Sequence, residues 1–201
     1  MAQERKILLF DVMDTICRDP FYKVMPAYFG MTLKELIAVK HPTAWLQFEK
    51  GETNQEDLFR DFFKDGRSFN HEAFLQTVVD EYGFLDGMEE LMGKLQAAGH
   101  QMHIMSNYTD WWRLIEQKLE LSRFAKWTFL SCEGPMKGHR KPAPECFAIA
   151  AETLEAPLQD LILIDDRAPN VEAAVTAGLQ GIHFQSADQL SNQLQLLGFT
   201  F

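Results

Sequence analysis

Short runs of consecutive apolar residues recur along the chain, and such runs are typical of buried strands in a parallel sheet. The first is ILLF at positions 7–10, and the others lie at 102–105, 127–130, 161–164 and 181–184. His103 stands between apolar neighbours in the second run and is expected to be structural. Helical spacing separates the later runs, and strands joined by single helices require right-handed crossovers. The pattern therefore predicts an α/β fold: a Rossmann-like, three-layer, doubly wound parallel sheet of about five strands.

About seventy residues between the first two runs have helical spacing only. Apolar positions 58, 59, 62 and 63 share one helical face, and positions 74, 75, 78 and 79 repeat the pattern, so these stripes are expected to pack together. Thr32 and Thr53 each precede a Glu by three residues, which is the capping-box spacing, and Asn70 is suited to cap a third helix. The sequence predicts an all-helical cap inserted over 17–86, with the core formed by 1–16 and 87–201.

Composition and charge exclude several classes of partner. The chain has 201 residues and a formal net charge of −10, without a block of Lys or Arg, which argues against nucleic-acid binding. No apolar run approaches the length that crosses a bilayer, so no membrane partner is expected. A monomer is favoured, although the sequence does not determine the oligomeric state.

The cysteines and the N-terminus bear on localisation. Three cysteines, an odd number, have no metal-ligand spacing and indicate reduced thiols in a cytosol-like compartment. The first strand is expected from residue 7, which leaves no room for a secretory signal peptide. We therefore expect a cytoplasmic protein, and a cleaved organelle-targeting peptide is the open alternative.

Polar residues follow the predicted strands at the edge where open α/β sheets bind ligands. Asp11 follows the first strand, and taken alone an Asp there is more often a turn cap than a catalytic residue. However, Ser106–Asn107 and Asp165–Asp166 follow two further strands, and Lys141 lies in a loop before a helix. Adjacent carboxylates repel unless a cation or a proton compensates them, and oxygen ligands favour Mg²⁺. The sequence therefore predicts a site for Mg²⁺ and phosphate, in which Lys141 and Ser106 hold phosphoryl oxygens.

Four motifs in this order resemble those of the haloacid dehalogenase superfamily. They are FDVMDT at 10–15, IMSN at 104–107, KPAPECF at 141–147 and IDDRAPNVEAA at 164–174. The run WLQFEKGE at 45–52 is similar to the helical cap of the superfamily's small-metabolite phosphatases. The ordered set covers essentially the whole chain, and it implies a Rossmann-like hydrolase with an inserted helical cap.

The resemblance implies a role for each matching residue. Asp11 would attack phosphorus to form an aspartyl-phosphate. Mg²⁺ would be held by the Asp11 carboxylate, the backbone carbonyl of Met13 and Asp166, with Asp165 close by.

The remaining motif residues are expected to handle the phosphate. By the same resemblance, Ser106 and Lys141 would grip the phosphoryl oxygens, and Asn107 would orient Asp11 and the transferred group. Thr15 would support the turn after the first strand. The inserted cap is expected to close over the site and select the substrate.

Position 13 departs from the superfamily's phosphatases, which usually carry a second Asp there as general acid and base. Met13 cannot transfer protons, and general acid–base catalysis contributes about 10²–10⁴-fold. One interpretation is that Asp14, which follows immediately, is a displaced acid, since residues at i and i+3 of a helix-like turn can face alike. Another is a substrate whose leaving group needs no proton, with weak turnover of alkyl phosphates.

Two further alternatives follow from Met13. A metal-independent 2-haloacid dehalogenase also lacks the acid, but such enzymes generally lack the paired acids that Asp165 and Asp166 provide here. A catalytically weak phosphate-binding or regulatory protein would also keep the ligands and lose the acid. The interpretation favoured by the sequence is a Mg²⁺-dependent phosphatase or phosphotransferase that acts on a small phosphorylated metabolite.

Overall fold

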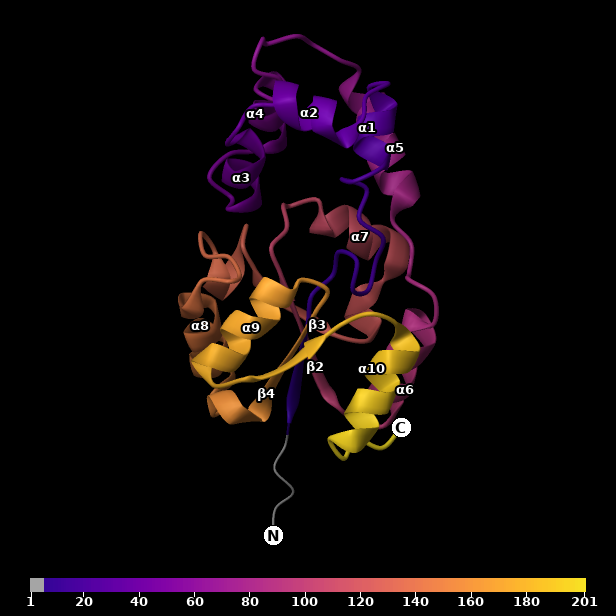
Figure 1. The fold of residues 1–201 in the computed structure, drawn as a ribbon, viewed down its shortest axis with the longest axis vertical. Coiled ribbons are helices and arrows are strands. Elements are labelled where there is room, and N and C mark those ends of the chain that lie inside the picture. Colours follow the sequence, from indigo (N-terminus) through magenta and orange to yellow (C-terminus); the bar gives the residue numbers. More distant parts are fainter. Residues whose placement is uncertain (1–5) are drawn as a thin grey trace.

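The computed structural model describes residues 6–201, and five parallel strands form its sheet. The strands are β1 (Ile7–Phe10), β2 (Gln101–Ser106), β3 (Lys126–Leu130), β4 (Leu161–Asp165) and β5 (Gln180–His183). Their order is β3-β2-β1-β4-β5, so the first strand of the chain is central (Figure 1). The predicted doubly wound sheet of five strands is confirmed.

The two faces of the sheet bury different helices because successive residues of a strand point to opposite sides. Along β1, Leu8 and Phe10 belong to one apolar cluster, and Ile7 and Leu9 belong to the other. The first cluster includes α6 (Met88–Ala97), α7 (Trp112–Leu119) and α10 (Ala187–Leu196), whereas the second includes α8 (Pro144–Leu154) and α9 (Ala168–Ala177). Three short 3-10 turns complete the core: η1 (Leu121–Arg123), η2 (Gly134–Met136) and η3 (Leu158–Asp160). This gives the predicted three layers.

His103 on β2 is a buried structural residue, as predicted. Its Nδ1 lies 2.7 Å from Thr128 Oγ1, and its Nε2 lies 3.0 Å from Gln101 Nε2. Burial, together with the nearby positive charge of Lys126, lowers the pKa of His103 to about 4. The ring is therefore neutral at physiological pH, donating from Nδ1 and accepting at Nε2.

Five helices form a cap above the carboxyl ends of the strands (Figure 1). They are α1 (Val24–Tyr28), α2 (Leu33–Val39), α3 (Ala44–Glu49), α4 (Gln55–Arg60) and α5 (His71–Glu81). The chain enters and leaves the cap through two linkers that lie side by side, since Arg18 N donates to Gly83 O and Leu85 N donates to Ile16 O. None of the helices in residues 6–201 is long and apolar enough to cross a membrane.

The predicted helix starts are mostly correct. Thr32 caps α2 in a capping box with Glu35, and Asn70 caps α5. The prediction for Thr53 is wrong by one residue, because Asn54 caps α4 and its partner is Asp57. Both positions carry a side chain suited to capping, and an Asn is at least as good an N-cap as a Thr.

Aromatic side chains form the interior of the cap, as their helical spacing predicts. The Phe29 ring lies 5.0–5.5 Å, centroid to centroid, from the rings of Phe62, Phe63, Phe69 and Phe74. Such pairs add stability beyond the burial of apolar area. These rings belong to the same apolar cluster as Leu8 and Phe10 of β1, so the interior of the cap is continuous with one face of the sheet.

Candidate active site

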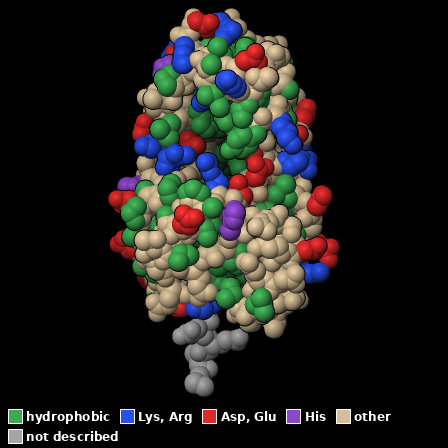
Figure 2. All heavy atoms as spheres, in the orientation of Figure 1, with side chains coloured by type: hydrophobic (Ala, Val, Ile, Leu, Met, Phe, Trp, Pro, Cys, Tyr) green, Lys and Arg blue, Asp and Glu red, His purple; other side chains and the backbone are tan. Residues whose placement is uncertain are grey.

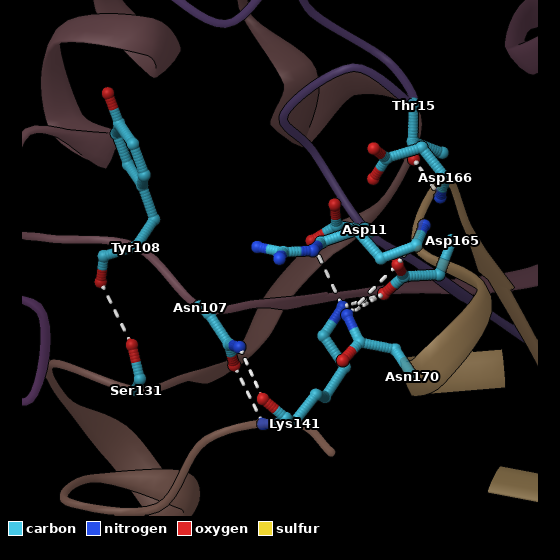
Figure 3. A network of polar contacts seen from close by, with 10 residues as sticks. Asp11, Thr15, Asn107, Tyr108, Ser131, Lys141, Asp165, Asp166 and Asn170 are labelled. Atoms are coloured by element: carbon cyan, nitrogen blue, oxygen red, sulfur yellow. Dashed lines mark hydrogen bonds and ion pairs between the residues drawn. The ribbon is translucent and has the colours of Figure 1, made fainter. Parts of the chain in front are cut away.

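Three carboxylates meet at the carboxyl edge of the sheet. Asp11 follows β1, Asp165 ends β4, and Asp166 follows it. One oxygen from each lies within 4.8 Å of the other two (Figure 3). Asp165 is fully buried, and Asp11 is 7% exposed. A cluster of oxygen donors at this spacing suits a hard divalent cation such as Mg²⁺, since that cation takes carboxylate ligands and would compensate their repulsion.

A fully buried lysine joins two of these carboxylates. Lys141 Nζ lies 3.0 Å from Asp11 Oδ1 and 2.6 Å from Asp165 Oδ2. Burial alone would lower the pKa of Lys141, but the two carboxylates outweigh burial and raise it. The ammonium group therefore stays charged.

Asn107 positions the lysine from the end of β2. Its Oδ1 accepts from Lys141 N at 2.8 Å, and its Nδ2 donates to Lys141 O at 2.7 Å (Figure 3). The expected role of Asn107, to orient Asp11 and the transferred group, stays a prediction. Within residues 6–201, its side chain hydrogen-bonds to the backbone of Lys141.

The two adjacent aspartates have different surroundings. Both oxygens of Asp165 accept from Asn170 Nδ2 at 3.0 Å, and Oδ1 also accepts from Arg167 N. The Asp166 carboxylate accepts no hydrogen bond within residues 6–201, whereas its backbone N donates to Thr15 Oγ1 at 3.1 Å. Thr15 therefore supports the turn that carries the free carboxylate.

Burial and mutual repulsion disfavour ionisation of Asp11 and Asp166. Burial, together with the charges of Asp165 and Asp166, raises the pKa of Asp11 to about 7 despite the attraction of Lys141. Burial, Asp165 and Asp14 likewise raise the pKa of Asp166 to about 6. A divalent cation placed between such groups reverses this effect, so the electrostatics of the cluster agree with a cation site.

Ser106 ends β2 with a buried hydroxyl group. The residue is 1% exposed, and its Oγ has no hydrogen-bond partner in the described part of the chain. A buried hydroxyl without a partner is costly. The group is therefore free to bind a ligand oxygen, which agrees with its predicted contact to phosphate.

A cavity of about 220 Å³ opens between the core and the cap above the carboxylates. Figure 2 shows this hollow, with acidic and basic side chains beside it. Its lining includes Asp11, Asp166, Asn107 and Met13 from the core, together with four aromatic residues, Phe21, Tyr22, Trp45 and Tyr108. A site that combines carboxylates with flat aromatic walls is suited to a polar reacting group attached to a large ring system.

Asp14, the predicted displaced acid, also lines the cavity. It has a left-handed φ of +52°, and its Oδ1 accepts from Asp19 N at 3.0 Å. Asp14 thus ties the turn after β1 to the start of the linker into the cap.

Sequence reasoning missed several residues of the cavity. Asp19 lines it from the linker, and Glu49 of the cap pairs with Arg140 of the core, with Arg140 Nε 2.6 Å from Oε1. Asn170, which anchors Asp165, was also missed. Its position one turn into the motif at 164–174 was the available signal, and for Glu49 the signal was the run at 45–52. Asp19 and Arg140 reach the cavity only through the tertiary fold.

A haloacid dehalogenase-like hydrolase family model matches residues 6–178. Flavin mononucleotide hydrolase 1, chloroplastic, from Arabidopsis thaliana is 46% identical over 200 residues, which cover 98% of this chain and 80% of that protein.

Two solved structures share the fold. An HAD family enzyme from Bacteroides thetaiotaomicron, as an Asp12Ala mutant in complex with magnesium and inorganic phosphate, has a TM-score of 0.77 at 19% identity, covering 94% of this chain and 98% of that one. L-2-haloacid dehalogenase from Xanthobacter autotrophicus has a TM-score of 0.61 at 16% identity, covering 94% and 82%. Because a protein that binds magnesium and phosphate and a 2-haloacid dehalogenase share this fold, the fold alone does not identify the reaction.

Proposed function

The chain belongs to the haloacid dehalogenase-like hydrolase family, and on that premise we propose that it is a Mg²⁺-dependent phosphatase that hydrolyses flavin mononucleotide to riboflavin and phosphate. The observation that carries this proposal is the cavity itself. Carboxylates and Asn107 line one part of this cavity, and aromatic side chains line another. Asn107 also holds Lys141 beside the carboxylates. The 46% identical relative, named as a flavin mononucleotide hydrolase, supports the same substrate.

The core residues would divide the phosphoryl chemistry among them. An Asp11 oxygen attacks phosphorus, the P–O bond to the riboflavin oxygen breaks, and water then attacks the aspartyl-phosphate to release phosphate. Lys141 Nζ and Ser106 Oγ would hold the phosphoryl oxygens, because one is a buried cation and the other an unpaired buried hydroxyl. Asn107 would keep the lysine in place through its two hydrogen bonds.

The donor set fits Mg²⁺. Asp11, Asp166 and the backbone carbonyl of Met13 would hold the ion. The fully engaged Asp165 would stay close by as the partner of Lys141. When bound, the ion neutralises charge on the phosphoryl oxygens and so favours attack by an anionic carboxylate.

The aromatic walls would select the isoalloxazine ring. Phe21 and Trp45 lie 6.3 Å apart, centroid to centroid, and both face the cavity with Tyr22 and Tyr108. Ring stacking on such side chains stabilises flat ligands and places few demands on hydrogen bonding. A small phosphorylated molecule with an extended ring system is therefore the proposed substrate class.

Localisation and oligomeric state stay predictions. The cytoplasm and a monomer are expected from the sequence. The 46% identical relative carries "chloroplastic" in its name, which supports the open alternative of an organelle.

Purified protein tests the function directly. We expect release of riboflavin and phosphate from flavin mononucleotide in Mg²⁺, and loss of that release when EDTA removes the ion. Asp11→Asn should lower the rate at least about 10³-fold, because an amide is a poor nucleophile. Equal rates with and without Mg²⁺ would refute the metal assignment, and metal-independent chloride release from a 2-haloacid would favour the dehalogenase interpretation.

A further inference from the structure

The proposed substrate raises a chemical problem that Met13 leaves unsolved. The ester oxygen of flavin mononucleotide belongs to a primary alcohol, whose departure requires a proton. Met13 lines the cavity beside Asp11 but carries no titratable group. If the chain hydrolyses this substrate, another side chain must supply the proton.

We propose that Asp19 is the general acid and base of this enzyme, supplied by the linker into the cap. The inference rests on the proposed phosphatase function. Asp19 is partly buried and lines the cavity that contains Asp11. Phe21 and Tyr22, which immediately follow it in the chain, line the same cavity.

The position of Asp19 fits the direction of the reaction. In an in-line displacement the leaving oxygen lies opposite the attacking oxygen, so the acid must stand on the cap side of the phosphorus. Asp11 lies at the end of β1, and the chain has begun its path into the cap by Asp19. Asp19 lines the same cavity as Asp11, Phe21 and Tyr22, so its carboxylate faces the space that the substrate would occupy.

Two hydrogen bonds fix Asp19 in place, one through its backbone and one through its side chain. Its backbone N donates to Asp14 Oδ1 at 3.0 Å, and its own Oδ1 accepts from Phe21 N at 2.8 Å. Its Oδ2 makes no hydrogen bond to any residue from 6 to 201, so this oxygen is available to the substrate. One oxygen is thus anchored while the other is free.

The surroundings of Asp19 bring the pKa of its carboxyl group closer to neutrality than that of an ordinary aspartate, which suits a group that both donates and accepts a proton. Burial, together with the carboxylates of Asp14 and Asp166, raises its pKa to about 6, against the smaller effect of Arg167. From the cap side, Tyr22 is neutral, and the charge of Glu49 is paired with Arg140.

Glu49 is the other acidic residue that the cap presents to the cavity, and it is less suited to the role. Its Oε1 accepts from Arg140 Nε at 2.6 Å, which stabilises the charged form. Burial raises the pKa of Glu49, but Arg140 opposes that rise and occupies one carboxylate oxygen, so Glu49 is less available than Asp19 to the substrate. Asp19 has no such cationic partner among its hydrogen bonds.

The proton balance closes over one turnover. As an Asp11 oxygen bonds to phosphorus, the P–O bond to riboflavin breaks and Asp19 gives its proton to the departing oxygen. The resulting Asp19 carboxylate then takes a proton from the water that attacks the aspartyl-phosphate. That attack breaks the bond to Asp11, releases phosphate and restores the Asp19 carboxyl group.

Asp19→Asn tests the proposal, because an amide keeps the Oδ1 acceptor for Phe21 N but cannot transfer a proton. We expect turnover of flavin mononucleotide to fall at least about 10²-fold. p-Nitrophenyl phosphate, whose leaving group needs no proton, should still phosphorylate Asp11. The variant should therefore release about one equivalent of p-nitrophenol in a burst and accumulate phosphoenzyme. Thermal stabilisation by Mg²⁺ should remain, as a check that the site is folded.

The matched control is Asp65→Asn in the cap, since Asp65 Oδ1 accepts from Arg67 N in the same i, i+2 arrangement. It should behave as wild type. The proposal would be overturned if Asp19→Asn hydrolysed flavin mononucleotide at a rate within threefold of wild type. It would also be overturned if Asp14→Asn gave the p-nitrophenol burst and Asp19→Asn did not. If the wild-type protein does not hydrolyse flavin mononucleotide, the proposed substrate is wrong. The burst with p-nitrophenyl phosphate would still test the role of Asp19.

Discussion

Asp165 and Asp166 are adjacent in the chain, but their carboxylates point in different directions and have different surroundings. Asp165 is the last residue of β4 and turns inward, where Lys141, Asn170 and the backbone of Arg167 occupy both oxygens. Asp166 follows the strand and leaves its carboxylate free above the sheet. One aspartate therefore holds the lysine, and the other has no hydrogen-bond partner for its carboxylate among residues 6–201.

Asparagine at each position should separate these roles in urea unfolding at pH 7.5. Asp165→Asn leaves the buried Lys141 with one counter-charge and should lower the unfolding free energy by about 3–5 kcal/mol. Asp166→Asn removes a repelled charge and should raise the free energy of the Mg²⁺-free protein by about 1–2 kcal/mol, a value reduced for partial exposure. It should also abolish the extra stability that Mg²⁺ gives to wild type. Destabilisation by both variants would contradict this division.

His103 predicts a pH dependence of stability. Its pKa is about 4 in the folded state against about 6.5 in an unfolded chain, so the unfolded state binds more protons between these values. The stability contribution is complete above pH 6.5 and is lost as pH falls toward 4. Between pH 7.5 and 5.5 the unfolding free energy should fall by about 1.4 kcal/mol through this residue.

His103→Gln removes that titration, so the variant should lose less stability than wild type over the same interval. His139→Gln is the control, because His139 is exposed. Comparison with wild type is needed because the raised pKa values of Asp11 and Asp166 give the opposite slope. If the unfolding free energy of His103→Gln changed with pH in parallel with that of wild type, the pKa of His103 would not differ between the folded and unfolded states.

At the scale of elements, the end of α3 is docked closely against the core. Ser131 Oγ donates to Glu49 O at 2.7 Å, and a Cβ at Gly51 would lie 2.1 Å from the Cys132 carbonyl oxygen. Only a glycine allows this approach. The last turn of α3 therefore contacts the loop after β3 backbone to backbone.

Gly51→Ala should move α3 away from the core, lowering the unfolding free energy by about 2–4 kcal/mol and raising KM for flavin mononucleotide. Gly66→Ala is a matched control: its φ of +68° is nearly that of Gly51 at +67°, but nothing lies within 4 Å of the added Cβ. It should cost only about 1 kcal/mol, from backbone strain. Equal losses in the two variants would mean that the contact to Cys132 is unimportant.

The sequence predictions are accurate for features that depend on residues close together in the chain, and less accurate for features that depend on the tertiary fold. Strands such as β1 and the caps at Thr32 and Asn70 depend on nearby residues, so their positions were predicted. Strand ends meet at one edge of a parallel sheet, and this brought Asp11, Ser106 and Asp166 within reach of prediction. No local pattern marks Asp19, because its function depends on a linker folding back over the site.

At the scale of the whole molecule, polar contacts hold the cap over the core at several places, of which three involve side chains of α7, of the turn before it and of the loop before α8. Arg140 of the core pairs with Glu49 of α3, and Trp111 Nε1 donates to Gln55 Oε1 of α4 at 2.7 Å. Lys118 Nζ donates to two backbone carbonyls near the end of α5. Of these three, the Arg140–Glu49 pair lines the cavity, so it joins closure of the cap to the shape of the substrate site.

Arg140→Met should therefore loosen one side of the cap. Glu49 is 6% exposed, so loss of its partner leaves a buried carboxylate uncompensated, at a cost of about 1–3 kcal/mol given the partial exposure of Arg140. Amide hydrogen exchange in α3 should accelerate about 10-fold or more, while α6 in the core stays protected. Arg113→Met provides the control, because the Arg113–Glu133 pair is exposed and lies within the core, so less than about 0.5 kcal/mol should be lost. Exchange that accelerates equally in α3 and α6 would mean that the pair stabilises the whole fold and not the closed cap.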